Sequence, residues 1–145
     1  MMIEMAWRAE TTDETVSPED DAAIRACLLD YFDGWFDGNA ERMDRALHPG
    51  LAKHALNQDA TRSGTLDVTT KDEMVEATSR GQGKQRDTPD RGIRIDILGV
   101  SGDIACASVH STVYVEYTLL ARTSDGWRIT GTLWRWADGH GPRAS

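Results

Sequence analysis

Residues that could handle protons recur at every second position in one β-rich stretch of the chain. His110, Tyr114 and Glu116 are its titratable members, and Thr112 and Thr118 continue the alternation. Alternate residues of a β-strand project from one face, so this spacing predicts a shared polar wall. The imidazole of His110 could act as a general base near neutral pH. The row is therefore a candidate wall of a site.

A structural role explains each of these residues, taken singly, at least as well. If residues 125–126 form a two-residue hairpin turn, Glu116 faces Arg135 as a simple cross-strand ion pair, and Leu133 joins the polar row. A bulged turn shifts the register by one residue and puts Trp134 opposite Glu116 instead. A bulge inside the long strand would likewise turn His110 to the other face. The sequence leaves both the register and the inward face open.

The histidines and cysteines do not predict a metal or nucleophile site. His48 and His54 lie about 20 Å apart if they share a strand, or about 240° apart around a helix. The chain contains no HxH, HExxH or CxxC pattern. Cys27 falls on an apolar helix face, and with Cys106 it is most simply a reduced core thiol. We expect no metal and no cofactor.

An aromatic helix near the start of the chain must position the first candidate residues. Ser17 is placed to cap it, Pro18 to begin it, and Gly38 to end it in the left-handed conformation. Its apolar residues recur at helical spacing and predict one buried stripe: Ile24, Cys27, Leu28, Tyr31, Phe32, Trp35 and Phe36. Four aromatic rings in that stripe need a large apolar partner.

Two shorter helices and two short strands are predicted before residue 93. The second helix lies between a cap at Asn39 and a stop at Pro49, and the third begins with a capping box at residues 70–73. Residues 51–56 and 65–69 have the composition of short strands, and residues 81–92 that of a loop. The buried residues are Met43, Ala46 and Leu47 in the second helix and Met74, Ala77 and Thr78 in the third.

The C-terminal half predicts a meander of three antiparallel strands. Residues 93–97 alternate, residues 104–123 form one unusually long strand, and residues 127–136 close the domain. The long strand is apolar on both faces, so one face should cover the helices and the other should meet a second copy of the chain. Together the elements predict an α+β fold in which helices cover a curved, mainly antiparallel sheet and leave a cavity.

Charge and composition exclude several partners. The net charge of −8 and pI of about 4.9 disfavour phosphate backbones and anionic lipid surfaces, so we expect no nucleic acid and no membrane partner. No apolar run approaches the length of a membrane helix, and residues 1–7 do not read as a signal peptide. We expect a cytoplasmic protein with an acidic mobile tail at residues 1–17, one domain at 18–137 and a flexible tail at 138–145.

Three sequence stretches resemble the nuclear-transport-factor-2-like superfamily. They are YFDGWFDGNAERM at residues 31–43, ALHP at 46–49 and GWRI at 126–129. Within the superfamily the chain is most similar to the SnoaL-like and putative lumazine-binding groups, over residues 18–137. The resemblance implies a cone-shaped α+β barrel with three N-terminal helices, a pocket inside the cone, and a dimer through the outer sheet face. The fold hosts enzymes and non-catalytic binders, so it does not by itself fix the function.

A gapless comparison with the ketosteroid isomerases of that superfamily bears on the chemistry. Tyr31 falls on their oxyanion-hole tyrosine. Their general-base aspartate falls near Leu56, with His54 two residues earlier, and their acidic oxyanion donor falls near Thr118, with Glu116 two residues earlier. By this comparison the chain has the oxyanion-hole tyrosine of the isomerases but lacks their base carboxylate.

These observations predict a pocket inside the cone and three ranked functions. The first is a binder of a flat, mostly apolar molecule with a hydrogen bond from Tyr31. The second is a SnoaL-like acid–base enzyme acting on a small cyclic substrate, for which the catalytic candidates are Tyr31, His54, His110 and Glu116. The third is a dimeric interaction module with a filled cone. The predicted pocket lining is Tyr31, Trp35, His54, Met74, Thr78, His110, Tyr114, Glu116 and Leu133.

A homodimer is predicted from an apolar row on the outer face of the long strand. The row consists of Val109, Val113, Val115, Tyr117 and Leu119. Left in water, it would be a sizeable exposed patch.

Overall fold

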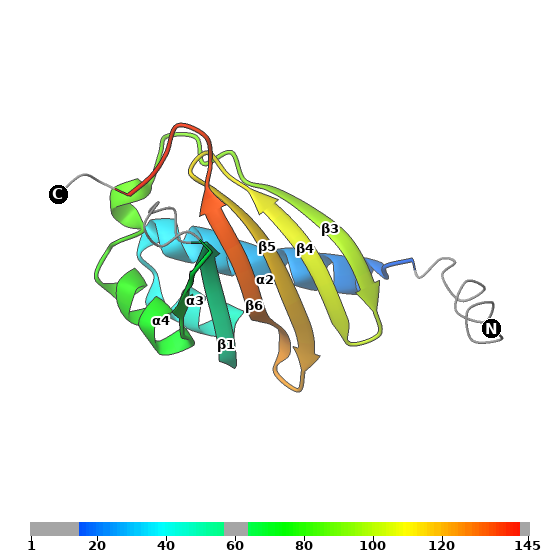
Figure 1. Cartoon of the computed structure of the whole chain (residues 1–145). Helices are drawn as coiled ribbons and strands as arrows, with labels where there is room; N and C mark the ends of the chain where they lie inside the picture. Colours follow the sequence, from blue (N-terminus) through cyan, green and yellow to red (C-terminus); the bar gives the residue numbers. More distant parts are fainter. Residues whose placement is uncertain (1–14, 57–63, 143–145) are drawn as a thin grey trace.

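The computed structural model describes residues 15–56 and 64–142, shown in Figure 1. Within these residues the chain forms three α-helices, one short 3₁₀ helix and six β-strands. The helices are α2 (Pro18–Asp37), α3 (Ala40–Ala46), α4 (Lys71–Ser79) and the 3₁₀ helix η2 (Lys84–Arg86). The strands are β1 (Leu47–Leu56), β2 (Leu66–Thr69), β3 (Arg94–Ser101), β4 (Ile104–His110), β5 (Tyr114–Thr123) and β6 (Gly126–Trp136).

The strands form one curved, open sheet in the order β2-β1-β6-β5-β4-β3. The β1–β6 pair is parallel and the other pairs are antiparallel. Helix α2 runs across one face of this sheet, and α3 and α4 lie beside β1 (Figure 1). The predicted α+β cone, with three helices on a mainly antiparallel sheet, is confirmed.

The helix boundaries follow from their caps, as the sequence predicts. The Ser17 side chain accepts a hydrogen bond from the Asp20 backbone N–H, and Pro18 occupies the first turn of α2. Gly38 ends α2 with φ at 67°, a left-handed conformation that favours glycine. Thr70 and Glu73 form the predicted capping box of α4.

The predicted long strand at residues 104–123 is wrong, because the chain reverses at residues 111–113. The Ser111 N–H donates to the Tyr114 carbonyl at 2.8 Å, and the Ser111 hydroxyl accepts from the Tyr114 N–H at 2.9 Å. A serine side chain can hold such a turn without glycine or proline. The meander therefore has four strands, and His110 and Thr112 do not share a strand with Glu116.

The predicted end of the second helix is also wrong. Helix α3 ends at Ala46, and both Leu47 and Pro49 belong to β1. Leu47 pairs with Ile129, but the register then shifts before Ala52. Pro49 lies inside this irregular part of the ladder, where its missing N–H costs no regular hydrogen bond.

The β5–β6 hairpin settles the register that the sequence leaves open. Thr123 pairs with Gly126, so Ser124 and Asp125 form the turn, and a register shift follows at Leu119. As a result Glu116 lies opposite Trp134, and Arg135 faces Val115 instead. Of the two partners that the sequence leaves open for Glu116, the structure therefore has Trp134, and the Glu116–Arg135 ion pair does not form.

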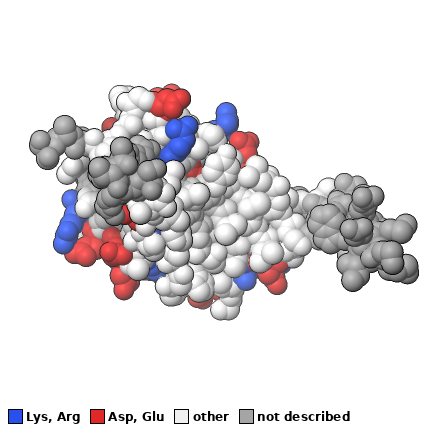
Figure 2. Space-filling model, in the orientation of Figure 1, with Lys and Arg blue, Asp and Glu red and all other residues white. Residues whose placement is uncertain are grey.

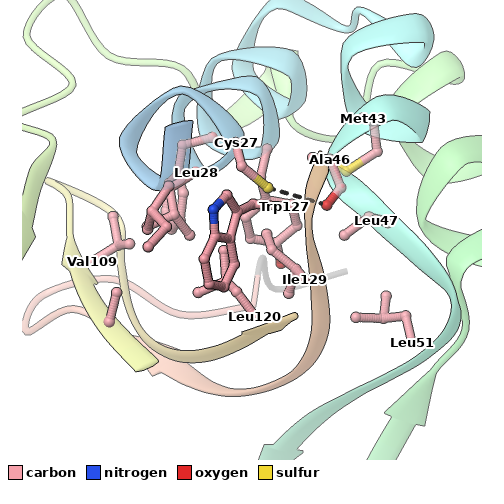
Figure 3. Packing of buried hydrophobic residues seen from close by; sticks show 14 of the residues in the cluster. Cys27, Leu28, Met43, Ala46, Leu47, Leu51, Val109, Leu120, Trp127 and Ile129 are labelled. Carbon is pink, nitrogen blue, oxygen red and sulfur yellow. Dashed lines mark hydrogen bonds between the residues drawn. The ribbon is translucent and has the colours of Figure 1, made fainter. Parts of the chain in front are cut away.

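A dry apolar core fills the space between the first half of α2 and the sheet (Figure 3). Its labelled members come from α2, α3 and four strands: Cys27, Leu28, Met43, Ala46, Leu47, Leu51, Val109, Leu120, Trp127 and Ile129. The Cys27 thiol donates to the Ala46 carbonyl at 3.4 Å, and burial raises its pKa to about 12. A thiol held this far from ionisation is structural.

The chain ends are only partly described. Most of the predicted acidic tail, residues 1–14, lies outside the described residues, as do residues 143–145. The Gly141 carbonyl accepts a hydrogen bond from Arg86 at 2.7 Å. Among the described residues no helix is long and apolar enough to cross a membrane.

Candidate functional site

A cavity of about 480 Å³ lies between the second half of α2, helix α4, the loop that carries η2 and the inner face of the sheet. Most of its wall is aromatic or apolar, and a few polar side chains interrupt it. The lining residues are Tyr31, Phe32, Trp35, Lys53, Thr69, Met74, Ala77, Gln82, Gln85, Arg86, Tyr114, Glu116, Trp134, Trp136 and Pro142. Pockets that bind small organic molecules typically combine this size with this composition.

One wall of the cavity carries three titratable groups in hydrogen-bond contact, which we name the Lys53–Tyr31–Glu116 cluster. The Tyr31 hydroxyl donates to Glu116 Oε2 at 2.7 Å, and Lys53 Nζ donates to the Tyr31 hydroxyl. Lys53 Nζ also lies 3.6 Å from Glu116 Oε2. The hydroxyl of Tyr31 therefore bridges a buried ion pair.

The sheet register brings these groups together from distant parts of the sequence. Lys53 on β1 lies beside Thr132 of β6, and Thr132 lies beside Thr118 of β5. Residues opposite one another across a ladder share a face of the sheet. Glu116 is two residues from Thr118, so its side chain projects from that same inner face toward Tyr31 on α2.

Burial sets the protonation of the cluster. It raises the pKa of Tyr31 well above its ordinary value of 10.0, and the charge of Glu116 adds to the rise. Burial lowers the pKa of Lys53, although the nearby Glu116 carboxylate acts in the opposite direction. Desolvation of an ammonium is costly even when a counter-charge is present. The rings of Tyr31 and Trp134 lie 5.1 and 5.2 Å from Lys53 Nζ and also favour its cationic form.

Thr132 places a buried hydroxyl beside the cluster. Its side chain lies near enough to affect the pKa of Tyr31, yet the two groups do not meet in hydrogen-bond geometry. Among the described residues it is the one buried side-chain polar atom without a hydrogen-bond partner. A buried polar atom without a hydrogen-bond partner destabilises the fold unless another molecule supplies that partner.

Aromatic rings that pack on one another form an aromatic wall next to the cluster. Tyr114, Trp134 and Trp136 make mutual ring contacts with centroids 5.2 to 5.5 Å apart. The Trp35 indole N–H donates to the Tyr114 hydroxyl at 3.0 Å, and burial raises the pKa of Tyr114. The Arg86 guanidinium lies 4.5 Å from the Trp136 ring centroid. These contacts fix the rings in place before any ligand arrives.

The loop that closes the cavity is held by an ion-pair network and a close backbone approach. Arg91 binds Asp33 at 2.8 Å and Asp37 at 2.6 Å, and so ties the loop to α2. A Cβ at Gly83 would collide with Trp35, so only glycine allows this approach. The loop thereby brings Gln82, Gln85 and Arg86 to the cavity.

Comparison with known protein families identifies the chain. Residues 19–135 match the family described as putative lumazine-binding, which is most of the chain. The chain belongs to the putative lumazine-binding family. No functionally curated protein matches it.

Solved structures agree with this family assignment at the level of the fold. An NTF-2 like protein of unknown function from Silicibacter pomeroyi has a TM-score of 0.64 and 16% identity, over 85% of this chain and 100% of its own. An NTF2-like protein of unknown function from Methylobacillus flagellatus has a TM-score of 0.61 and 20% identity, over 85% and 96%. A ketosteroid isomerase-like protein from Erwinia carotovora has a TM-score of 0.55 and 15% identity, over 84% and 99%. The nuclear-transport-factor-2-like resemblance is thus confirmed.

The structure brings five of the nine residues predicted to line the pocket to the wall of the cavity. They are Tyr31, Trp35, Met74, Tyr114 and Glu116. The other four, His54, Thr78, His110 and Leu133, are not among its lining residues.

The four others miss the cavity for two physical reasons. His54 pairs with Leu133, and Leu133 with Tyr117, so His54 and Leu133 lie on the outer face, and Leu133 is 49% exposed. His110 pairs with Val115, one residue from the inward Glu116, and also faces outward. Thr78 is buried in α4, where its hydroxyl donates to the Met74 carbonyl at 2.7 Å.

Lys53 is the member of the Lys53–Tyr31–Glu116 cluster that the sequence did not predict. The signal available was its separation by two residues from Leu51, which is buried on the same strand. A lysine that shares a face with a buried leucine is unusual. His54 drew attention instead because it aligned near the base of the isomerases, one residue out of phase with the inner face.

Metal binding has no support in this part of the chain. Among residues 15–56 and 64–142, no group of three or more His, Cys, Asp or Glu side chains is placed to hold a metal ion.

Proposed function

We propose that the protein binds a flat small molecule in the cavity, with the ligand's rings against the aromatic wall and a polar edge at Lys53. The observation that carries this proposal is the Lys53–Tyr31–Glu116 cluster at the wall of a 480 Å³ aromatic cavity. Lumazine, which the family is named for, is a flat bicyclic compound with carbonyl groups along its edge. It is the first probe that we would use.

The energetic cost of the cluster supports a binding role. A buried ion pair is often no more stabilising than apolar side chains of the same volume. Lys53 and Glu116 have side chains only 12% and 3% exposed. The presence of the Lys53–Glu116 pair beside a cavity is explained if its polar atoms form hydrogen bonds with a bound ligand.

Lys53 replaces Tyr31 as the expected donor to the ligand. The proton of the Tyr31 hydroxyl is engaged with Glu116, so the hydrogen bond predicted from Tyr31 would require this contact to break. An ammonium has three N–H donors, and Tyr31 accepts one of them from Lys53. A ligand carbonyl or carboxylate can accept another.

Calorimetric titration with lumazine tests the proposal. We expect saturable binding by the native protein and loss of most binding in Ala77→Phe, because Ala77 lines the cavity and a ring there fills it. Ala26→Phe is the matched control, since Ala26 is exposed on α2. Equal binding by both variants, or no heat at lumazine concentrations up to millimolar, would reject this cavity as a lumazine site.

An acid–base enzyme is the second candidate, and the Tyr31–Glu116 hydrogen bond favours it. A phenol and a carboxylate at 2.7 Å can pass a proton to or from a bound substrate. Of the four catalytic residues predicted from the sequence, only Tyr31 and Glu116 reach the cavity. The cavity itself counts against the third candidate, an interaction module with a filled cone.

We also propose a homodimer through the outer face of the sheet. Val109 and Val113, two of the residues predicted for this interface, are instead buried in the core. An exposed apolar group still crosses the outer face, formed by Val68, Leu133, Tyr117 and Leu119. Figure 2 shows that the centre of the face turned to the viewer carries few charges.

Light scattering at micromolar concentration tests the dimer. We expect twice the chain mass for the native protein and one chain mass for Tyr117→Lys, which places a charge in the middle of the apolar group. A monomeric native protein would contradict the proposal. The expected cytoplasmic location and the absence of nucleic-acid and membrane partners rest on charge and composition, and they too stay proposals.

A further inference from the structure

We propose that Lys53 forms a reversible imine with the carbonyl carbon of an aromatic aldehyde or ketone bound in the cavity. This inference rests on the proposed function, since it requires that a flat ligand enters the same cavity. It adds a covalent step and a substrate class to that binding. Three groups around Lys53 carry it: Tyr31, Glu116 and the aromatic wall.

The hydrogen bonds of the cluster form a ready proton path. Lys53 Nζ donates to the Tyr31 hydroxyl, and that hydroxyl donates to Glu116 Oε2. A proton leaving Lys53 can therefore reach the Glu116 carboxylate through Tyr31 without any rearrangement of heavy atoms. The amine that remains has its lone pair available beside the cavity that Lys53 lines.

The chemistry balances without an added reactant. The Lys53 lone pair attacks the carbonyl carbon, a C–N bond forms, and the carbonyl oxygen takes the proton held by Glu116 to give a carbinolamine. That hydroxyl then leaves as water with a second proton from the nitrogen. The sum converts an ammonium and a carbonyl into a protonated imine and water, with no change in charge. Glu116 consequently has a positive partner both before and after the reaction.

The surroundings of Lys53 favour this amine over the others. The chain has three lysines, Lys53, Lys71 and Lys84. Lys71 is paired with Asp44 at 3.3 Å, and Lys84 is exposed. Burial lowers the pKa of Lys53, which increases the fraction of neutral amine at a given pH. Arg86, the other cation in the cavity wall, is a guanidinium and stays protonated.

The aromatic wall defines the class of carbonyl compound. Trp134 lies over Lys53 and in ring contact with both Tyr114 and Trp136. A carbonyl attached to a flat ring can stack on these side chains while its carbon approaches Nζ. An aliphatic aldehyde of similar size would gain less from the wall.

Reductive trapping with 2-naphthaldehyde tests the inference on the native chain at pH 7. Sodium cyanoborohydride donates a hydride to the imine carbon and leaves a stable naphthylmethyl amine, which peptide mass mapping can locate. We expect Lys53 to be labelled severalfold faster than Lys71 or Lys84, because burial lowers the pKa of Lys53 and the Trp134 ring beside Nζ can hold the aldehyde there. In urea the three lysines should react alike, which makes Lys71 and Lys84 internal controls.

Two variants test the role of the cluster. Lys53→Arg keeps the positive charge beside Glu116, so the fold should persist while labelling at this position disappears. Glu116→Gln interrupts the proton path and should slow Lys53 labelling severalfold, although loss of the carboxylate charge alone would lower the Lys53 pKa further and speed it. Unchanged or faster labelling of Lys53 in Glu116→Gln would overturn the proposed path.

A non-reactive analogue separates this inference from the proposed function. 2-Naphthylmethanol has the same ring but no carbonyl, and calorimetry measures its binding. If it binds and Lys53 is labelled no faster than Lys71 and Lys84, the imine inference is overturned and the binding function stands. If it does not bind and Lys53 is not selectively labelled, the imine inference is overturned, and the lumazine titration decides whether the binding function is overturned with it. Binding together with selective labelling that an excess of the alcohol suppresses supports both.

Discussion

The two halves of helix α2 meet the same sheet in opposite ways. The first half, with Ile24 and Leu28, packs against Val109, Leu120 and Ile129 in a dry core, and each of these side chains is at most 2% exposed (Figure 3). The second half carries Tyr31 and Trp35 to a cavity whose wall holds a buried ion pair. One helix and one sheet thus build both a closed core and an open site.

This difference shows that the cavity end of α2 is packed less favourably for stability than the core end. Aliphatic side chains fill the core end completely, which is the most stabilising use of that space. At the cavity end the sequence keeps a lysine, a glutamate and several large rings around an unfilled volume. Sites that depart from the rules of stable packing are where function is expected. The predictions below test this contrast by changing one end at a time.

The largest effect should come from breaking the buried ion pair. Glu116→Leu leaves the Lys53 ammonium buried without its counter-charge, and we expect a loss of about 3–5 kcal/mol in the free energy of unfolding. The double variant Lys53→Met with Glu116→Leu should recover most of this loss. Urea denaturation measures both. A single variant as stable as the double one would show that the pair is not buried as described.

Truncating a buried side chain of the core should lower the free energy of unfolding almost as much as breaking the ion pair. It should also lower it more than truncating Trp35 at the cavity does. Leu28→Ala removes a fully buried side chain, so we expect a loss of about 2–5 kcal/mol. Phe32 lines the cavity but is only 2% exposed, so Phe32→Ala should cost about 3–5 kcal/mol. Trp35→Ala should cost less than Leu28→Ala despite its larger ring, because Trp35 is only half-buried and faces open space. The reverse order in denaturation midpoints would contradict the contrast.

A smaller effect is expected for Tyr31→Phe. The change removes the hydroxyl that bridges Lys53 and Glu116, so each loses one buried hydrogen bond. We expect about 1–3 kcal/mol lower stability, the usual cost of leaving a buried polar group unsatisfied. Tyr117→Phe is the matched control because Tyr117 is 55% exposed. Equal denaturation midpoints for the two variants would show that the Tyr31 hydroxyl does not bridge Lys53 and Glu116.

Alkaline pH should weaken the fold more gently. The pKa values of Tyr31 and Tyr114 are raised by burial above the ordinary 10.0. Between the unfolded and folded pKa values the unfolded chain releases protons that the native chain keeps, so stability falls as pH rises above about 10. Thermal unfolding across that range, compared with Tyr31→Phe, measures the effect. A native protein equally stable before and after phenol ionisation would contradict the burial of these hydroxyls.

The sequence predicted those parts of the molecule that depend on local signals. Ser17, Gly38 and the Thr70 capping box define their helix ends within a few residues, and the stripe of α2 defines its buried face. The strand break at residues 111–113 escaped prediction because a serine side chain, not glycine or proline, holds the turn. A local pattern of apolar alternation cannot reveal such a reversal.

The candidate site depended on long-range pairing and was therefore only half predictable. Tyr31 and Glu116 could be found from the resemblance and the alternation. Lys53 reaches them only because β1 pairs in parallel with β6. The register of that pair cannot be predicted from the sequence of either strand alone. The turn at Ser124 and Asp125 together with the shift at Leu119 likewise decided that Trp134, not Arg135, faces Glu116.

One measurement tests the central claim that the cavity end, and not the core end, of α2 is the ligand site. The indole N–H resonances of the tryptophans can be followed by NMR while lumazine is added. Trp35, Trp134 and Trp136 line the cavity, whereas Trp127 is 3% exposed in the dry core and donates to Asp20 at 3.2 Å. We predict that the three cavity signals shift in a saturable way and that the Trp127 signal stays fixed. Fixed cavity signals, or an equal shift of Trp127, would contradict the account.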